Sequence, residues 1–312
     1  MNATMTWPGR LAYAALWLLG AIPLRWLHAL AGVLAWPLSK LNFRESRVAW
    51  VNLQLCYPEL DPAQRRRRHR QCLRESLCML LESGRVWTRP AGEALRWVVE
   101  VHGAEHLRRA RAGGRGVIVA APHLGNWELF GQYLSSLGPL SIVYREPQWA
   151  PAHQILLRGR GGQQVEQLPA QPASVRKMLK ALRDGRLLGI LPDQQPKLGE
   201  GEFAPFFSIP ALTMTLLSRL AAKSAVAVVF GFAERLPSGG FRVHFLPAPA
   251  GIDDPDPRQA AAALNRGVEA CLACSPWQYQ WTYKRYSRRP ADGSRNPYRH
   301  GHESIRPSSE LS

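Results

Sequence analysis

Two apolar runs dominate the start of the chain, over residues 11–24 and 26–38, with Arg25 between them. Neither run alone reaches the roughly 20 residues that a helix needs to cross a bilayer, and prolines at 23 and 37 bend or end helices. Together the runs can anchor the chain if Arg25 snorkels or the segment lies obliquely in the interface. A buried pair of core helices is the alternative. Clustered tryptophans favour the membrane, and we predict an anchor over residues 1–39.

A helical pattern follows over residues 62–81. Asp61 suits the N-cap and Pro62 the first helical position. The leucines at 73, 77, 80 and 81 form one apolar face, and the other face carries a run of arginines. A charge run is usually a solvated face, but beside an anchor it favours contact with anionic headgroups.

From about residue 97, short β-branched runs alternate with helical segments. Strands are predicted at 98–101, 116–121, 141–144, 187–191, 225–232 and, as an antiparallel strand, 241–246; helices are predicted near 127–137, 172–183 and 211–222. This alternation indicates an α/β fold with a mostly parallel central sheet flanked by helices. We assign this domain to residues 40–290 and a basic, flexible tail to residues 291–312.

Composition narrows the class of partner. The formal net charge of +17 implies nucleic acid, an anionic membrane or an acidic protein or lipid, and eleven tryptophans favour the membrane. Basic residues at 40, 44 and 47 directly follow the anchor and predict that the remainder lies on the cytoplasmic face. Five cysteines, an odd number, do not indicate a disulfide framework.

The strand predicted at 116–121 runs directly into Pro122-His-Leu-Gly-Asn-Trp-Glu128. Functional groups collect at the carboxyl ends of parallel strands. Gly125 permits a tight turn, and Asn126 is a good N-cap for a helix that starts at Trp127. The loop-to-helix break then lets Glu128 hold one imidazole nitrogen of His123 while the other takes a proton. Backbone N–H groups at the helix start can face a developing oxyanion.

A lone histidine after a strand is more often structural than catalytic. Here it comes with a carboxylate, a turn glycine and an N-cap, so we predict His123 as general base and Glu128 as its partner. No G-x-S-x-G nucleophile elbow is present, which favours direct attack by an activated substrate hydroxyl. The motif lacks metal-ligand spacing, and we expect no metal.

At this point the chain resembles the late acyltransferases of lipid A biosynthesis, the lauroyl/myristoyl transferases of Gram-negative bacteria, within the lysophospholipid acyltransferases. Five blocks in order carry the resemblance: 122–128, Tyr144-Arg145, 189–194 (Gly-Ile-Leu-Pro-Asp-Gln), 203–207 with Pro210-Ala211, and 278–286 (Gln-Tyr-Gln-Trp-Thr-Tyr-Lys-Arg-Tyr). Glycerophosphate acyltransferases usually have aspartate where this chain has Glu128. The chain departs from the family at Ser208, usually glycine, and at 275–277, usually Pro-Glu.

The resemblance implies an enzyme that moves a fatty acyl chain from acyl carrier protein, or from coenzyme A in some members, to a hydroxyl of a lipid A precursor. It implies no cofactor, a phosphorylated glycolipid acceptor, and a place on the cytoplasmic face of the cell inner membrane in lipopolysaccharide biosynthesis. Acyl carrier protein is acidic, so basic surfaces at 65–70 and 284–289 can steer it.

Carried over to this sequence, the resemblance gives His123 and Glu128 the roles above. Further substrate-binding residues are Arg145, which would bind a phosphate or the thioester oxygen, together with Asn126, Asp193, Gln194, Phe206 and Phe207. Asp193 can either orient the site or cap its loop. Phe206 and Phe207 can either line an acyl-chain groove or belong to the core.

Two other functions are consistent with parts of the sequence. The first is acylation of a different membrane lysolipid, of the ornithine or glycerol type. The second is a basic protein that binds membrane or nucleic acid without catalysis, which explains the arginines and tryptophans but leaves the His123 turn without a purpose. We therefore expect an enzyme, and no nucleic acid as partner.

Overall fold

The structure is a computed structural model that describes residues 6–147, 150–160, 165–291 and 295–299. Its helices are α1 (Trp7–Ala21), α2 (Leu24–Leu38), α3 (Arg44–Cys56), α4 (Pro62–Thr88), α5 (Ala91–Leu95), α6 (Ala104–Arg111), α7 (Trp127–Ser136), α8 (Ala150–Gly159), α9 (Val175–Arg183), α10 (Leu216–Ser224) and α11 (Pro257–Cys274), with short 3-10 turns η1 (Pro172–Ser174) and η2 (Pro276–Gln278). Its strands are β1 (Val98–His102), β2 (Val117–Ala120), β3 (Leu140–Tyr144), β4 (Val165–Pro169), β5 (Leu187–Ile190), β6 (Gly201–Phe206), β7 (Ile209–Met214), β8 (Val228–Arg235) and β9 (Phe241–Pro247).

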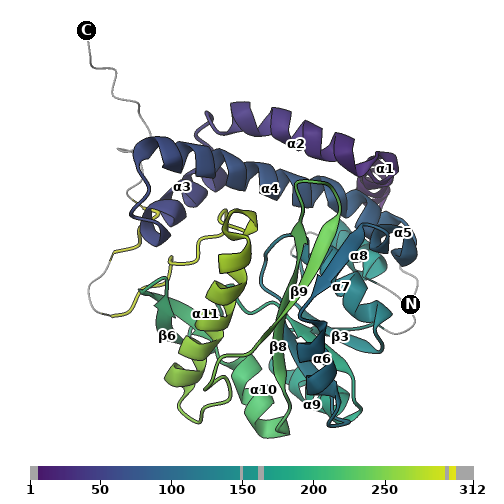
Figure 1. Cartoon of the computed structure of the whole chain (residues 1–312), viewed down its shortest axis with the longest axis vertical. Helices are drawn as coiled ribbons and strands as arrows, with labels where there is room; N and C mark the ends of the chain where they lie inside the picture. Colours follow the sequence, from purple (N-terminus) through teal and green to yellow (C-terminus); the bar gives the residue numbers. More distant parts are fainter. Residues whose placement is uncertain (1–5, 148–149, 161–164, 292–294, 300–312) are drawn as a thin grey trace.

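A 7-stranded sheet in the order β1-β9-β8-β2-β5-β3-β4 forms the centre of the molecule (Figure 1). Its neighbouring strands pair in parallel except β8 and β9, which are antiparallel. This confirms the predicted α/β fold with a mostly parallel sheet, and also the antiparallel strand predicted at 241–246.

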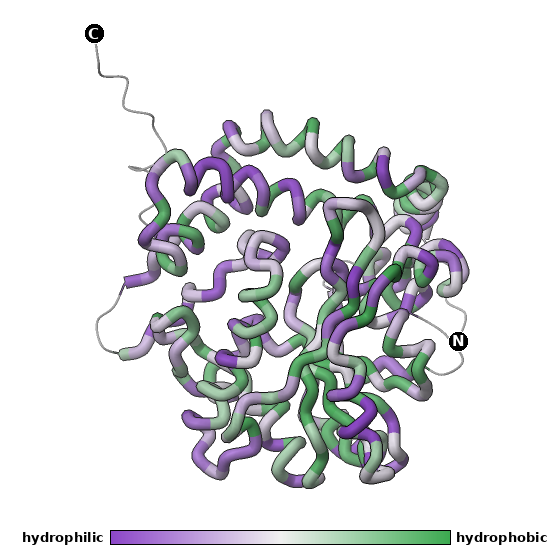
Figure 2. Tube along the Cα trace, in the orientation of Figure 1, coloured by the Kyte–Doolittle hydropathy of each residue, from purple (hydrophilic) through white to green (hydrophobic). Residues whose placement is uncertain are grey.

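Helices cover both faces of this sheet. Along β2, Ile118 and Ala120 point into the core beneath α9, α10 and α11, whereas Val117 and Val119 point into the core beneath α6 and α7. A strand buried on both faces needs apolar residues at every position, which is why these strands read as continuous apolar runs. Figure 2 shows these runs as green, hydrophobic segments along the central strands.

Helix α4 passes across the edge of the sheet at which β8 ends (Figure 1). β2 and β5 end at the same edge because they run parallel to β8 and to each other. Asp61 caps α4 as predicted, accepting hydrogen bonds from the backbone at 63 and 64. The helix runs to Thr88, beyond the predicted end at residue 81, because its second half packs against α1. Gly20 of α1 and Gly84 of α4 permit this close approach: a Cβ on Gly84 would lie 2.8 Å from the Leu16 carbonyl oxygen.

The first two helices form a bent pair. Within the described ranges, no single helix combines the length and apolar character of a membrane span; α1 and α2 do so only together, and they meet at 111°. Their outward side chains are strongly exposed, including Trp7 at 73%, Trp26 at 59% and Val33 at 71%. Membrane anchoring by residues 1–39 stays a prediction.

Strand β4 and the separate hairpin of β6 and β7 were not predicted from the sequence. The helix predicted at 211–222 was partly wrong, since residues up to Met214 belong to β7 and α10 begins at Leu216. The run from 209 to 222 is mostly apolar, and only the pairing of β7 with β6 separates its strand half from its helical half.

Most of the predicted tail, residues 292–294 and 300–312, lies outside the described residues. Within the part that is described, Tyr298 is bound to the body of the protein. Its hydroxyl donates to Asn52 Oδ1 at 2.6 Å and accepts from the Tyr286 backbone N–H at 3.1 Å.

The turn between β6 and β7 gives a stability prediction. Phe207 and Ser208 occupy its two central positions with φ of 50° and 62°, in the left-handed region that favours glycine. Since Ser208 is exposed, Ser208→Gly removes strain without losing packing, and we expect the free energy of unfolding to rise by about 1 kcal/mol in urea titrations. Phe207→Gly is the control: it should destabilise, because Phe207 packs on Tyr57 and Trp281. An unchanged Ser208→Gly midpoint would contradict the strain argument.

Candidate active site

His123 and Asp193 meet at the carboxyl edge of the sheet, because the strands that precede them, β2 and β5, are neighbours. The Asp193 carboxylate accepts one hydrogen bond from His123 Nδ1 at 2.9 Å and another from the His123 backbone N–H at 3.1 Å. Asp193 is buried, whereas 13% of the His123 side chain is exposed. Asp193 thus both orients the imidazole and fastens the loop, the two roles that the sequence left open.

Burial alone would raise the pKa of Asp193. The charge of His123 and the hydrogen bonds from His123 and Tyr279 outweigh burial and hold that pKa below its usual range. The carboxylate is therefore ionised at neutral pH, which suits it to accept a proton-bearing Nδ1 and to stabilise an imidazolium.

The second ring nitrogen of His123 is bound by a neutral amide, which a substrate hydroxyl can replace. With Nδ1–H assigned as the donor to Asp193, Nε2 is an acceptor. The Gln194 side-chain amide lies 3.2 Å from Nε2 and donates to Gln280 Oε1 at 3.3 Å. The Trp127 ring packs edge-on against the imidazole, with 5.0 Å between ring centroids. Gln194 therefore lies beside the nitrogen that can take a proton from a substrate hydroxyl.

Glu128 does not hold the imidazole, contrary to the prediction from spacing. Its carboxylate accepts hydrogen bonds from Arg160 Nε at 2.8 Å and Trp87 Nε1 at 3.1 Å, and Arg160 Nη2 donates to the second oxygen. Glu128 lies in the first turn of α7 and faces α4 and the end of α8, whereas His123 Nδ1 faces β5. The predicted hydrogen bond is wrong, and Asp193 makes it instead.

An electrostatic link between Glu128 and His123 nevertheless exists. Burial raises the pKa of Glu128, but Arg160, Trp87 and, more weakly, His123 lower it further than burial raises it. Glu128 is thus an ionised carboxylate that orients the Arg160 guanidinium. The result is a fixed cation in a largely buried position close to the base.

The loop that carries His123 is held by its own backbone. Gly125 has φ of +63°, and a Cβ there would lie 1.9 Å from the Ala233 carbonyl oxygen, so only glycine fits. The Asn126 side chain accepts from Leu129 N at 2.8 Å, and Asn126 N donates to Ala233 O at 2.9 Å. Gly125 N donates to Gln278 O at 3.1 Å. The predicted turn and N-cap are both confirmed.

A cavity opens beside Glu128 and Arg160, between α4, α7, α8 and β3. Its other walls are mainly apolar and include Phe130, Leu134, Leu140, Ile142, Val165 and Leu191. Gly131 also faces it, with no atom closer than 4.0 Å to a Cβ built there. An apolar pocket with one ion pair in its wall suits a ligand with a hydrocarbon chain and a polar end.

Phe206 and Phe207 lie elsewhere, in the core cluster on the side of α9 to α11. Phe206 is 1% exposed, and its ring centroid lies 6.3 Å from that of Tyr286. The ring centroid of Phe207 lies 5.3 Å from that of Tyr57. Neither lines the cavity beside Glu128. Of the two alternatives that the sequence left open, the structure supports the core and not the groove.

Arg145 follows β3 directly and is exposed. Burial raises the pKa of Tyr283, and the charges of Arg285 and Arg145 are among the influences that oppose this rise. Tyr283 in turn accepts a hydrogen bond from Gln195 N at 2.9 Å, two residues beyond Asp193. Arg145 is thus exposed just beyond the carboxyl end of β3, where an anionic ligand can reach it.

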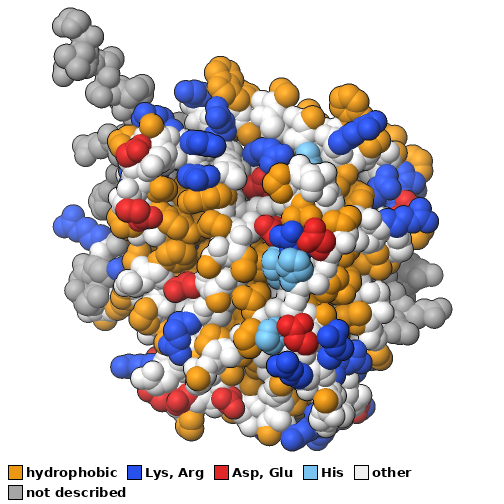
Figure 3. Space-filling view, in the orientation of Figure 1, with side chains coloured by type: hydrophobic (Ala, Val, Ile, Leu, Met, Phe, Trp, Pro, Cys, Tyr) orange, Lys and Arg blue, Asp and Glu red, His pale blue; other side chains and the backbone are white. Residues whose placement is uncertain are grey.

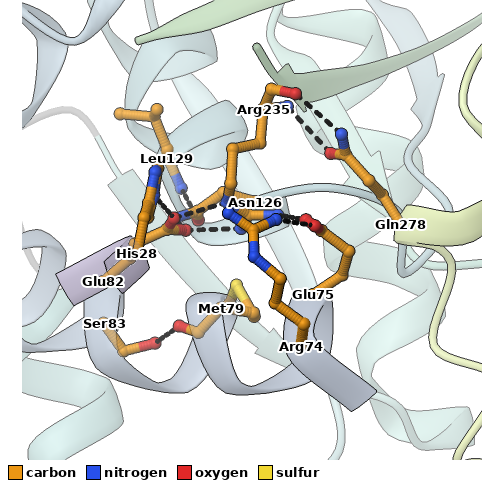
Figure 4. Close-up of polar contacts among 10 residues, drawn as sticks. All are labelled: His28, Arg74, Glu75, Met79, Glu82, Ser83, Asn126, Leu129, Arg235 and Gln278. Atoms are coloured by element: carbon orange, nitrogen blue, oxygen red, sulfur yellow. Dashed lines mark hydrogen bonds and ion pairs between the residues drawn. The ribbon is translucent and has the colours of Figure 1, made fainter. Parts of the chain in front are cut away.

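A buried ion cluster of Arg235, Glu82 and Glu75 contacts the loop through Asn126 (Figure 4). It was not predicted from the sequence. Arg235, at the end of β8, donates from Nε and Nη2 to the two oxygens of Glu82 at 2.5 and 2.6 Å, and from Nη1 to Glu75 at 2.5 Å. The three side chains are 3%, 0% and 5% exposed. The signal in the sequence was two carboxylates seven positions apart within the apolar stripe of α4, where a charge requires a partner.

One group among the described residues has the spacing of a metal site, formed by His28, Cys78 and Glu82. Glu82 already binds the guanidinium of Arg235, whose charge repels a cation. Burial raises the pKa of the Cys78 thiol to about 12, which opposes the thiolate form that metals need. The chemistry of this group favours hydrogen bonding over metal binding.

Comparisons with known proteins identify the family of the chain. A family model described as bacterial lipid A biosynthesis acyltransferase matches residues 1–288. The chain is 28% identical over 297 residues to the lipid A biosynthesis palmitoleoyltransferase of Escherichia coli K12, a match that covers 93% of each chain. It is 28% identical over 288 residues to the lauroyltransferase of the same strain, with 92% of each covered. A lipid A biosynthesis acyltransferase of Haemophilus influenzae is 27% identical over 270 residues, covering 85% of this chain and 82% of its own.

Proposed function

Because the chain belongs to the bacterial lipid A biosynthesis acyltransferase family, we propose that it transfers a fatty acyl chain from a carrier thioester to a hydroxyl of a lipid A precursor in lipopolysaccharide biosynthesis. The family match confirms the resemblance drawn from the five sequence blocks and makes the protein an acyltransferase. The His123–Asp193 pair is the observation that carries the proposed catalytic roles, and the family supports the proposed acceptor.

In the proposed reaction, His123 Nε2 takes the proton of the acceptor hydroxyl as its oxygen attacks the thioester carbonyl. Asp193 holds Nδ1 and stabilises the imidazolium that forms. The tetrahedral intermediate then collapses: the carbon–sulfur bond breaks, and the leaving thiolate takes the proton back from Nε2. The products are the ester and a free carrier thiol, and no covalent enzyme intermediate is needed.

Arg160 and Arg145 supply positive charge for the two anionic parts of this chemistry. Arg160, oriented by Glu128 in the wall of the cavity, is suited to the oxyanion of the tetrahedral intermediate. Arg145, exposed just beyond β3, is suited to a phosphate of the acceptor. The apolar walls beyond Arg160 are suited to the acyl chain.

The donor proposed here is acyl carrier protein, with acyl-coenzyme A as the alternative. Acyl carrier protein is acidic, and the first half of α4 exposes the basic side chains of Arg66, Arg67 and Arg70. Figure 3 shows basic side chains beside hydrophobic ones over the end of the molecule that α2 and α4 cover. Opposite charges of this kind raise association rates and make them sensitive to salt. The same basic and apolar surfaces suit a place at the cytoplasmic face of the inner membrane.

A reconstituted assay tests the proposal. Purified protein, acylated carrier and a phosphorylated lipid A precursor in vesicles should give an acylated product by mass spectrometry, and His123→Ala should lower kcat by about 10³-fold. His106→Ala, a change at a half-buried histidine on α6, is the control and should keep wild-type activity. Retention of activity by His123→Ala would contradict the role of the base. If the enzyme preferred an ornithine-type or glycerol lysolipid as substrate, the proposed lipid A acceptor would be wrong.

A further inference from the structure

Three buried polar side chains link helix α2 to the catalytic loop (Figure 4). His28 Nε2 lies 2.6 Å from Glu82 Oε1, and Asn126 Nδ2 donates to Glu82 Oε2 at 2.9 Å. The His28 side chain is 12% exposed, while Glu82 and Asn126 are fully buried. A contiguous chain of hydrogen bonds thus runs from the N-terminal hairpin to a residue three positions after His123.

The two faces of α2 have opposite environments. Leu27 and Ala31 are buried against α4, on the side from which His28 reaches Glu82. Trp26 and Val33, on the outer side, are 59% and 71% exposed. Exposed basic residues flank this apolar face at Arg25, Lys40 and Arg44. An apolar face with tryptophans and a basic margin matches a lipid layer with anionic headgroups, the surface in which the proposed acceptor lies.

At the other end of this series of hydrogen bonds, Asn126 is the N-cap of α7. Its amide group has two ends: Nδ2 donates to Glu82, which leaves Oδ1 to cap Leu129 N at 2.8 Å. Without the Glu82 acceptor, the amide loses the contact that fixes its orientation. The cap lies between His123 and Glu128, so its geometry affects both the base and the carboxylate that orients Arg160.

Among the described residues, two elements besides the loop hold the Glu82 carboxylate. Arg235 fixes both of its oxygens from β8, and His28 fixes one from α2. The Arg235 contact belongs to the rigid sheet. The His28 contact depends on where α2 lies, and α2 is the element with the exposed apolar face.

We propose that His28 and Glu82 are positioning residues that couple the contact of α2 with an anionic lipid surface to the geometry of the catalytic loop. When lipid holds α2 against α4, the His28–Glu82–Asn126 chain is complete and the loop is ordered for catalysis. When α2 is not supported by lipid, the chain loosens and turnover slows. This inference rests on the proposed acyl transfer.

The experiment compares the wild type with His28→Leu, which keeps much of the volume but removes the hydrogen bond. Activity is measured on an acceptor in anionic phosphatidylglycerol vesicles and on a short-chain, water-soluble acceptor without vesicles. We expect His28→Leu to lower kcat on vesicles by about tenfold, with KM and vesicle co-sedimentation within about twofold of the wild type. Without vesicles, its kcat should equal that of the wild type.

Two further variants separate positioning from simple destabilisation. His28→Gln keeps an N–H donor for Glu82 and should restore most of kcat on vesicles. Leu107→Ala removes buried packing on α6, away from α2, so it should lower Tm but leave kcat on vesicles near that of the wild type. Wild-type kcat in His28→Leu on vesicles would overturn the inference, as would an equal loss with and without vesicles or an equal loss in Leu107→Ala.

Hydrogen exchange provides a readout that does not need turnover. In the wild type, anionic vesicles should slow amide exchange across residues 123–129, and in His28→Leu this protection should be absent. Protection that is equal in both proteins overturns the coupling. A wild type that shows the protection but transfers no acyl group instead overturns the proposed function, so the two failures are distinguishable.

Discussion

Replacing Asp193 by asparagine is expected to lower kcat for acyl transfer by about 10³- to 10⁴-fold while the protein stays folded. The carboxylate accepts Nδ1–H and thereby keeps Nε2 of His123 unprotonated. An asparagine amide can turn its NH₂ group toward Nδ1, which moves the proton to Nε2 and removes the base. The imidazolium also loses its counter-charge. Single-turnover kinetics with a preloaded donor measure the chemical step directly.

Glu128→Gln is the matched control, since it changes the other buried carboxylate of the site. In the structure Glu128 orients Arg160, so its amide should weaken oxyanion stabilisation and lower kcat by about 10- to 100-fold. The smaller loss is the distinguishing result. If Glu128→Gln lost more activity than Asp193→Asn, the interpretation from sequence spacing would be correct and the pairing with Asp193 would be structural.

Asp193→Asn should also change how the stability of the protein depends on pH. The folded state holds the pKa of Asp193 below its usual range, so the wild type gains stability from this carboxylate at every pH above that range. The gain is lost as pH falls through the lowered pKa. Asp193→Asn lacks it throughout, and the difference in Tm between the two proteins should therefore shrink only in acid.

The sequence singled out His123 but not the residue that binds its imidazole, and the reason is the distance along the chain. His123 and Asp193 are 70 residues apart, and they meet because β2 pairs with β5. Strand order is set by the packing of the whole sheet and leaves no trace in local periodicity. Glu128 was selected because a neighbour in sequence is the only partner that spacing can reveal.

Features fixed by local chemistry were predicted well. The turn at Gly125, the cap at Asn126 and the cap at Asp61 depend on backbone groups within a few residues, and all three are present. The roles of Phe206 and Phe207 could not be decided, because an aromatic residue has the same pattern in a core as in a groove. The hairpin that carries them is defined by strand pairing alone.

Arg235→Met is expected to lower the free energy of unfolding by about 3–5 kcal/mol, the largest stability effect predicted for this protein. The change leaves Glu75 and Glu82 buried without their shared cation. Burial raises the pKa of Glu82, and Arg235 is the main group that lowers it below its usual value. Urea unfolding followed by tryptophan fluorescence measures the loss. Arg242→Met, which breaks partly exposed pairs with Glu100 and Glu234, is the control and should cost at most about 1 kcal/mol.

Replacing the whole cluster separates its contribution to stability from its contribution to the active site. With leucine at 75 and 82 and methionine at 235, no buried charge is left unpaired, so much of the lost stability should return. Activity should not return with it, because Asn126 still lacks the Glu82 oxygen that fixes its amide. A triple variant that regained both would mean that the cluster only stabilises the fold. One that regained stability alone would show that the charges are kept for the geometry of the catalytic loop.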